Sequence, residues 1–124
     1  MIALFSGRLD RPHPGHIITI QRLGQIYEKV IVCILDYPGQ KYPISYRKGV
    51  IQEALQHSKG EYLVLSNKTH FGKITNSELC EINDIEEWNV YVNANEEVLE
   101  HIDKLGYDTY FFPRYPGYSA SEED

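Results

Sequence analysis

Short apolar runs alternate along the chain with longer stretches in which apolar and polar positions follow a helical period. Five of the short runs are rich in β-branched, leucine and aromatic residues, which predicts strands. They are Ile2–Phe5, Val30–Leu35, Tyr62–Leu65, Val90–Val92 and Tyr110–Phe112. The second run is apolar throughout, which is typical of a parallel strand covered on both faces.

Between these runs apolar residues recur at three- and four-residue steps, which predicts amphipathic helices. The stretches with this pattern are Ile17–Tyr27, Tyr46–Leu55 and Val98–Leu105. Ser45 and Asn95 are suitable N-caps for the second and third, and Gly106 is a suitable stop signal for the third. Thr75 and Glu78 have capping-box spacing, which predicts a further, shorter helix.

The alternation of strands and helices predicts an α/β fold, a Rossmann-like parallel five-stranded sheet with helices on both faces. The length of 124 residues predicts one domain, residues 1–124. Sheets of this kind bind ligands beyond the carboxyl ends of the strands, at the point where the strand order reverses. The loop after the first strand is therefore the first place to look for a site.

Composition narrows the classes of function. A formal net charge of −6 argues against general nucleic-acid binding, which needs a basic face, but it leaves room for a small phosphate pocket. Cys33 and Cys80 are too few for a disulfide framework or a zinc site. The N-terminal apolar run ends too early for a signal peptide, and no run approaches the ~18 apolar residues of a membrane span. We expect a cytoplasmic protein with no membrane partner.

The loop after the first predicted strand carries features that suit a phosphate. Gly7 lets a ligand approach the backbone closely, and Gly15 opens a helix whose free N–H groups and dipole favour an anion. His13 and His16 are three residues apart, so both face the mouth of a helix that begins near Pro14. Two imidazoles there can donate hydrogen bonds to phosphate oxygens as charge builds in a transition state. Two cations, Arg8 and Arg11, lie in the same loop.

These residues also carry a family resemblance. The run Gly7-Arg8-Leu9-Asp10-Arg11-Pro12-His13-Pro14-Gly15-His16 resembles the G-x-F-D-x-x-H-x-G-H signature of the cytidylyltransferase-like nucleotidyltransferases, with leucine in place of the phenylalanine. Three further segments are similar to that family's motifs. They are the loop Asp36–Pro43 with Lys41 followed by the pair Arg47-Lys48, the turn Asn93–Glu96, and the segment Pro113–Ser121. In length and motifs the chain is most similar to the glycerol-3-phosphate cytidylyltransferase branch.

The resemblance implies a reaction. In that family the phosphate of a small acceptor attacks the α-phosphate of a nucleoside triphosphate, and pyrophosphate leaves with Mg²⁺ bound and without a covalent enzyme intermediate. Catalysis of this kind is positioning and electrostatics. The residues with an implied catalytic role are His13, His16, Lys41 and Arg114. The residues with an implied role in nucleotide binding are Gly7, Arg8, Asp10, Gly15, Arg47, Asn95, Ser119 and Ser121. No metal ligand from the protein is expected, and a homodimer is a family expectation.

Alternatives stay open at each level. The short length and the run Pro113-Arg114-x-x-Gly117 favour transfer of CMP from CTP. Gly7-Arg8, with Gly106-Tyr107 and Tyr118-Ser119 near the end, resembles the NMN adenylyltransferases, which use ATP. Three carboxylates after Ser121 would repel a triphosphate, which favours a third hypothesis, a non-catalytic nucleotide-binding module.

The single residues also have ordinary structural interpretations. Lys41 and Arg47 suit a solvated surface, Asn95 suits a helix cap, and Ser119 with Glu122 has capping-box spacing.

Overall fold

A computed structural model describes residues 1–36 and 38–113 and contains the α/β fold that the sequence predicts. The strands are β1 (Ile2–Gly7), β2 (Lys29–Leu35), β3 (Tyr62–Asn67), β4 (Val90–Asn93) and β5 (Asp108–Phe111). The helices are α1 (Pro14–Ile26), α2 (Ile44–Leu55), α3 (Asn76–Ile85) and α4 (Glu96–Lys104). Every strand and helix predicted above is present, and β5 begins two residues before the predicted run.

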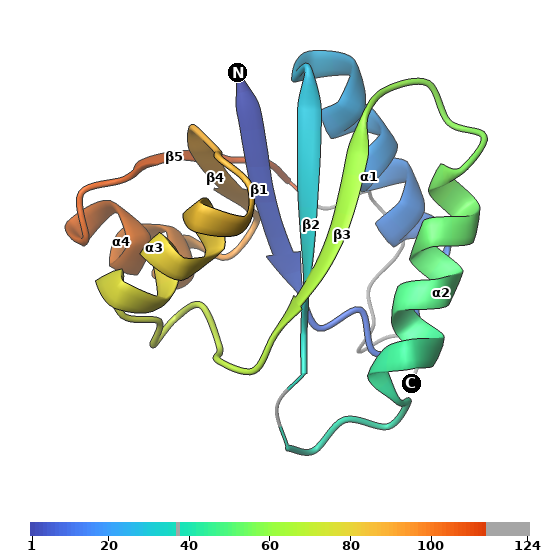
Figure 1. The fold of residues 1–124 in the computed structure, drawn as a ribbon, viewed down its shortest axis with the longest axis horizontal. Coiled ribbons are helices and arrows are strands. Elements are labelled where there is room, and N and C mark those ends of the chain that lie inside the picture. Colours follow the sequence, from blue (N-terminus) through green and yellow to red (C-terminus); the bar gives the residue numbers. More distant parts are fainter. Residues whose placement is uncertain (37, 114–124) are drawn as a thin grey trace.

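The five strands form one parallel sheet in the order β3-β2-β1-β4-β5. The chain runs from β1 outward to β3, and then returns to the other side of β1 to add β4 and β5. The strand order therefore reverses between β1 and β4, which is where open α/β sheets leave a crevice for ligands. The loops that follow Gly7 and Asn93 begin at the carboxyl ends of these two strands (Figure 1).

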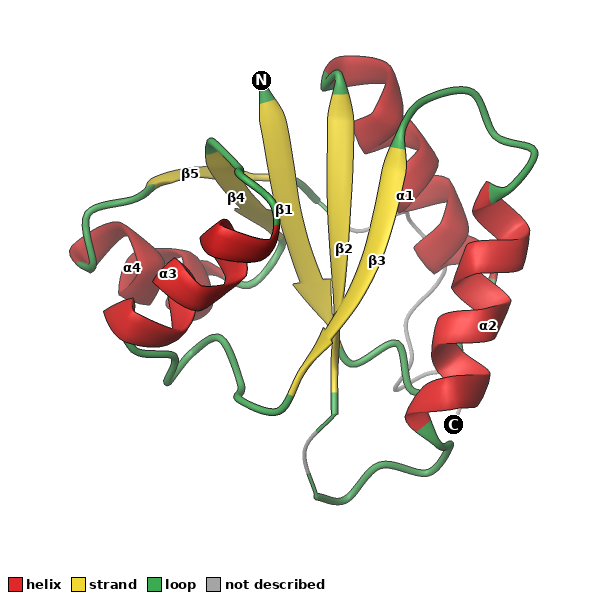
Figure 2. Ribbon diagram, in the orientation of Figure 1, coloured by secondary structure: helices red, strands yellow, loops and turns green. Residues whose placement is uncertain are grey.

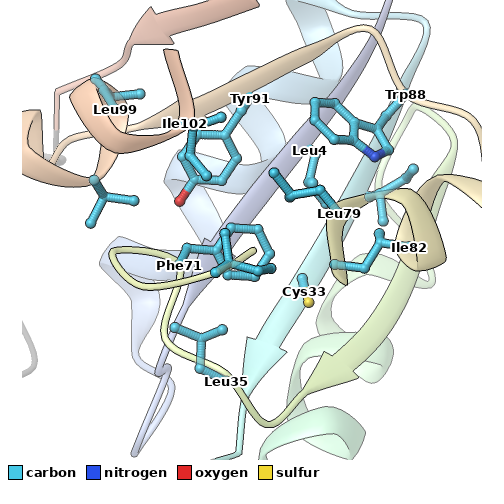
Figure 3. Packing of buried hydrophobic residues seen from close by; sticks show 13 residues of the cluster. Leu4, Cys33, Leu35, Phe71, Leu79, Ile82, Trp88, Tyr91, Leu99 and Ile102 are labelled. Carbon is cyan, nitrogen blue, oxygen red and sulfur yellow. The ribbon is translucent and has the colours of Figure 1, made fainter. Parts of the chain in front are cut away.

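Helices cover both faces of the sheet. Helices α1 and α2 lie on one side, and α3 and α4 lie on the other (Figure 2). Residues of α1 and α2 pack against one face of β1, β2 and β4 in a cluster that includes Ile20, Leu23 and Ile51. On the opposite face, Phe71, Leu79 and other residues pack around Tyr91 of β4 (Figure 3). Strand side chains alternate between these two clusters, so the central strands are buried on both faces.

Two of the three N-caps predicted from the sequence are present in the structure. Asn95 caps α4, its side chain accepting from the N–H groups of Glu97 and Val98, and Gly106 follows α4 with a φ of 96°. Thr75 and Glu78 form the predicted capping box of α3. The prediction of Ser45 as the cap of α2 is wrong, because Pro43 occupies that position and makes no side-chain hydrogen bond there. No helix in residues 1–36 and 38–113 is both long and apolar enough to cross a membrane.

Candidate active site

The two histidines of the first loop form the N-terminal cap of α1. Helix α1 begins at Pro14, whose missing N–H suits the first turn. His13 is the N-cap, and its Nδ1 accepts from the backbone N–H of Gly15 over 3.1 Å. His16 completes a capping box, since its Nδ1 accepts from the backbone N–H of His13 over 3.2 Å. The rings stack with centroids 3.8 Å apart and planes 21° apart. The prediction that both rings face the helix mouth is confirmed.

This cap defines what the two rings can donate. A ring nitrogen that accepts from a backbone N–H carries no proton, so the neutral ring has its proton on Nε2. Nε2 lies on the side of each imidazole away from Nδ1, so each ring directs an N–H away from the backbone that it caps. His13 is buried at 8% exposure, and His16 is half-buried. The pair therefore places Nε2 atoms near the positive end of a helix, that of His13 buried from solvent, and donors in this position suit an anionic ligand.

The helix tip differs from the sequence expectation in one respect. The predicted anion site relied on free backbone N–H groups in the first turn of α1. The N–H of Gly15 is bonded to His13 Nδ1, and the N–H groups of His16 and Ile17 both bond to the carbonyl oxygen of His13. These donors are thus engaged by the cap. The helix dipole remains, and the donors that the tip offers are those of the imidazoles.

The loop between β1 and α1 has a strained backbone. Leu9 and Arg11 both lie in the left-handed region, at φ 45° and 75°, where residues with a side chain are uncommon. Leu9 is 3% exposed and belongs to the core cluster that includes Ile20 and Leu23 of α1. At Gly7, by contrast, a Cβ would meet only Leu9 at an ordinary distance of 3.5 Å, and the backbone is that of a strand. The fold does not require glycine at position 7, which is consistent with its predicted role in close approach of a ligand.

Asp10 is engaged by the protein rather than open to a nucleotide. Its Oδ2 accepts from the backbone N–H of Lys41 over 2.7 Å, and its Oδ1 accepts from that of Tyr42 over 2.9 Å. Arg8 lies 3.6 Å away as an ion pair, and its side chain is half exposed. Burial raises the pKa of Asp10, but the two N–H groups, with Arg47 and Arg8, outweigh burial and lower that pKa below 3.8. The carboxylate is therefore ionised at neutral pH.

Arg47 is completely buried, so the interpretation of this residue as a solvated surface arginine is wrong. Its guanidinium donates to three backbone carbonyl oxygens, those of Tyr42, Arg8 and Leu35, over 2.7 to 2.9 Å. It also forms an ion pair with Asp36 at 3.3 Å. Arg47 thus joins the loops that follow β1 and β2. Lys41, in the second of these loops, has an exposed side chain on a backbone held by Asp10.

On the far side of the crevice, the sequence identified Asn95, but the structure draws attention to Asn93. The side-chain oxygen of Asn95 accepts two backbone N–H groups of α4, which agrees with its interpretation as a cap. Asn93 ends β4, and its Nδ2 donates to the carbonyl oxygen of Ser6 over 2.9 Å and to the Tyr91 hydroxyl over 3.0 Å. The Tyr91 hydroxyl also bonds Ser6 Oγ. This buried polar network links β1 to β4 at the point where the strand order reverses. The sequence signals for Asn93 were its place in the turn Asn93–Glu96, which resembles a family motif, and its position directly after an apolar strand.

Three of the residues named by the sequence, Arg114, Ser119 and Ser121, lie outside the described residues. Within the described ranges, no group of three or more histidine, cysteine or acidic side chains could hold a metal ion. The one carboxylate of the first loop, Asp10, has both oxygens engaged by backbone N–H groups. The described site is thus made of imidazoles and cations, which suits phosphate oxygens better than a divalent metal.

No protein-family model matches the chain. Among characterised proteins, it is similar to phosphopantetheine adenylyltransferases. Identity is 39% over 59 residues with the Gloeothece citriformis enzyme, covering 46% of this chain and 38% of that protein. Identity is 32% over 68 residues with the Streptococcus sanguinis enzyme, covering 52% of this chain and 41% of that protein. The chain thus spans about two fifths of the length of these relatives. The sequence similarity to nucleotidyltransferases is partial and distant.

Solved structures share the fold over nearly the whole chain. A bifunctional NMN adenylyltransferase/ADP-ribose pyrophosphatase from Francisella tularensis, complexed with AMP and a Mn ion, has a TM-score of 0.74 at 20% identity. The match covers 98% of this chain and 39% of that one. A universal stress protein in complex with cAMP has a TM-score of 0.58 at 14% identity, covering 91% of this chain and 96% of that one. At these identities the likeness concerns the fold alone.

Proposed function

We propose that this chain is a nucleotidyltransferase that transfers an adenylyl group from ATP to a small phosphorylated acceptor and releases pyrophosphate. The observation that carries the proposal is the stacked pair His13 and His16 at the tip of α1, beside the reversal of strand order. A pair of Nε2–H donors at a helix N-terminus matches the charge that builds on an α-phosphate under attack. The partial similarity to phosphopantetheine adenylyltransferases supports the same chemistry.

The choice of ATP reverses the preference for CTP that the sequence motifs gave. The segment that favoured CTP follows Pro113 and lies outside the described residues. The relatives with detectable sequence similarity are adenylyltransferases, and the Francisella structure with the same fold contains AMP. ATP is therefore the donor that these observations favour, and CTP is the competing donor in the test.

In the proposed reaction, an acceptor phosphate oxygen forms a bond to the α-phosphorus of ATP while the bond to the β-phosphate oxygen breaks. Pyrophosphate leaves with the electron pair of that bond. His13 and His16 donate hydrogen bonds to oxygens of the α-phosphate through Nε2, and Lys41 neutralises charge on the departing phosphates. A bound Mg²⁺ would neutralise phosphate charge. Because the described residues offer no carboxylate cluster to hold it, its ligands would be phosphate oxygens.

The test is release of pyrophosphate with ATP or CTP and a panel of three acceptors: 4′-phosphopantetheine, nicotinamide mononucleotide and glycerol 3-phosphate. We expect turnover with ATP, and a loss of about 100- to 1000-fold in kcat/KM for His16→Ala, as for removal of one donor to a developing oxyanion. His101→Ala is the matched control, since this histidine bonds to the carbonyl oxygen of Ile74, away from the site. ATP binding without turnover for any acceptor would instead indicate a nucleotide-binding module.

A further inference from the structure

Two loops at the carboxyl edge of the sheet are fastened to each other by buried charged groups. We call Arg8–Pro12 the histidine-side loop and Pro38–Pro43 the lysine loop. The first follows β1 and leads into the histidine cap of α1. The second leads into α2 and contains Lys41. Two side chains, Asp10 and Arg47, connect these loops through four hydrogen bonds. Arg47 also bonds Leu35 and Asp36 at the end of β2.

Asp10 binds the lysine loop through consecutive backbone groups. Both carboxylate oxygens are used, one for the N–H of Lys41 and the other for the N–H of Tyr42. Hydrogen bonds to an ionised acceptor are about twice as strong as those between neutral groups. The side chain of Asp10 is only 4% exposed, so little water competes for these bonds. The contact fixes the backbone from which the Lys41 side chain extends.

Arg47 holds the same segment from the other side. Its Nε donates to the carbonyl oxygen of Tyr42, while its Nη1 donates to the carbonyl oxygens of Arg8 and Leu35. Both backbone polar groups of Tyr42 are therefore bound, one by Asp10 and one by Arg47. The planar guanidinium reaches both loops and the end of β2 because its donors lie in a fixed fork.

The backbone around Asp10 indicates that this arrangement is costly to form. Its two neighbours, Leu9 and Arg11, both have positive φ, and such residues cost of order 1–3 kcal/mol each unless the surroundings hold them. A buried arginine with a single carboxylate partner is a further cost. Strain and buried charge of this kind concentrate where a site must be held in one geometry.

We propose that Asp10 and Arg47 are positioning residues that hold the lysine loop against the histidine-side loop and so place Lys41 beside the His13–His16 pair. This inference rests on the proposed function. It replaces the expectation from the sequence that both side chains bind the nucleotide. Lys41 is the residue that touches phosphate, and Asp10 and Arg47 act through it. Without them, Lys41 loses its fixed distance from the imidazoles, and small displacements of a catalytic group are expensive in rate.

The first experiment needs no substrate. Amide hydrogen exchange of Lys41 and Tyr42 is compared between the wild-type chain, Asp10→Asn and the matched control Asp103→Asn, an exposed aspartate on α4. We expect Asp10→Asn to accelerate exchange of both amides by about tenfold or more, because the neutral amide offers one oxygen where the carboxylate offers two. Asp103→Asn leaves both rates unchanged. Equal exchange in Asp10→Asn and wild type would overturn the proposal.

A second variant distinguishes loss of this contact from loss of the fold. Asp10→Glu keeps the charge and both oxygens but displaces them by one methylene, so it should restore part of the protection that Asn loses. Circular dichroism reports whether each variant is folded. Protection of Lys41 and Tyr42 that is as low in Asp10→Glu as in Asp10→Asn, with both folded, would show that the charge of this carboxylate does not hold the loop.

A double-mutant cycle tests whether Asp10 acts on catalysis by positioning Lys41. It compares kcat/KM for Asp10→Asn, Lys41→Ala and the double variant. We expect each single change to lower kcat/KM by about 10- to 100-fold, mainly through kcat, and the double variant to be no worse than Lys41→Ala. Losses that multiply would overturn the positioning role. If the wild-type chain shows no turnover with any acceptor, the proposed function fails, whereas the exchange experiment still decides whether Asp10 holds the loop.

Discussion

Asp10 and Glu78 are two carboxylates that each fasten a loop at the carboxyl edge of the sheet. Asp10 accepts from the N–H groups of Lys41 and Tyr42, and Glu78 accepts from the Thr69 hydroxyl and from the N–H and hydroxyl of Thr75. Bonding of this kind lowers the pKa of both groups against the effect of burial. The two regions nevertheless differ in how far along the chain these contacts reach and in what surrounds them.

The contacts of Glu78 are local. They span three to nine residues, lie within the capping box of α3 and the loop before it, and sit on ordinary backbone. The contacts of Asp10 span more than 30 residues, are buried, and lie between two residues of positive φ. A local capping contact stabilises the helix that it caps. A buried contact between distant loops on strained backbone stabilises a particular geometry, which is what a site needs.

The largest expected effect is on the free energy of unfolding. It concerns core packing on the side of the sheet where Glu78 lies. The core cluster on the side of α3 and α4 contains Phe71, which stacks on Tyr91 with centroids 5.4 Å apart (Figure 3). Phe71 is 1% exposed, so Phe71→Ala should lower the free energy of unfolding by about 3–5 kcal/mol. Phe111→Ala, at a position 46% exposed, is the matched control and should cost far less. Urea unfolding measures both, and a cost below about 1 kcal/mol for Phe71→Ala would contradict the assignment of this cluster as a core.

A smaller effect on the free energy of unfolding is expected where hydrogen bonds link β1 to β4. The buried hydroxyl of Tyr91 bonds Ser6 and Asn93, so Tyr91→Phe leaves polar atoms of β1 and β4 without this partner. The expected cost is about 1–3 kcal/mol in the free energy of unfolding. Tyr107→Phe is the control, because its hydroxyl contacts are exposed. Equal effects for the two variants would mean that the buried network does not join the two halves of the sheet.

The same contrast explains how much of the molecule could be predicted from its sequence. Strand and helix periods are local, so the five strands and the four helices follow from patterns over a few residues. The parallel sheet follows from the alternation of these elements along the chain. The caps at Thr75 and Asn95 are also local and were predicted. The histidine pair could be placed at the tip of α1 because Pro14 and Gly15 mark the start of that helix.

The partners of Asp10 and Arg47 could not be predicted in this way. Nothing in the spacing of these residues says that a guanidinium in the first turn of α2 is fully buried among carbonyl oxygens of two loops and the end of β2. Burial of a charge depends on the tertiary arrangement, and helix position alone suggests a solvated residue. The same holds for the free N–H groups expected at α1. The N–H of Gly15 is engaged through an orientation of the His13 side chain that no sequence pattern specifies. The N–H groups of His16 and Ile17 bond to the backbone carbonyl oxygen of His13.

The smallest expected effect is on the free energy of unfolding at acidic pH. There the contributions of the two carboxylates, Asp10 and Glu78, can be compared directly. The pKa of each is lower in the folded state than its ordinary value, about 4.5 for Glu78 and 3.8 for Asp10. Between the folded and unfolded pKa values the unfolded chain binds more protons, so stability rises with pH in that window. Each contribution is therefore complete above the ordinary value and is lost as the pH falls through the folded value.

Because the ordinary pKa of Glu78 is the higher one, its contribution should begin to weaken at a higher pH than that of Asp10. Urea unfolding of the wild type, Glu78→Gln and Asp10→Asn, at a series of pH values from about 7 down to about 3, separates the two. Glu78→Gln should flatten the dependence of stability on pH below about 4.5, and Asp10→Asn should flatten it only below about 3.8. An unchanged slope in Glu78→Gln would mean that this carboxylate gains nothing from Thr69 and Thr75 on folding. The local contact of Glu78 and the long-range contact of Asp10 would then no longer be comparable as contacts that stabilise the folded state.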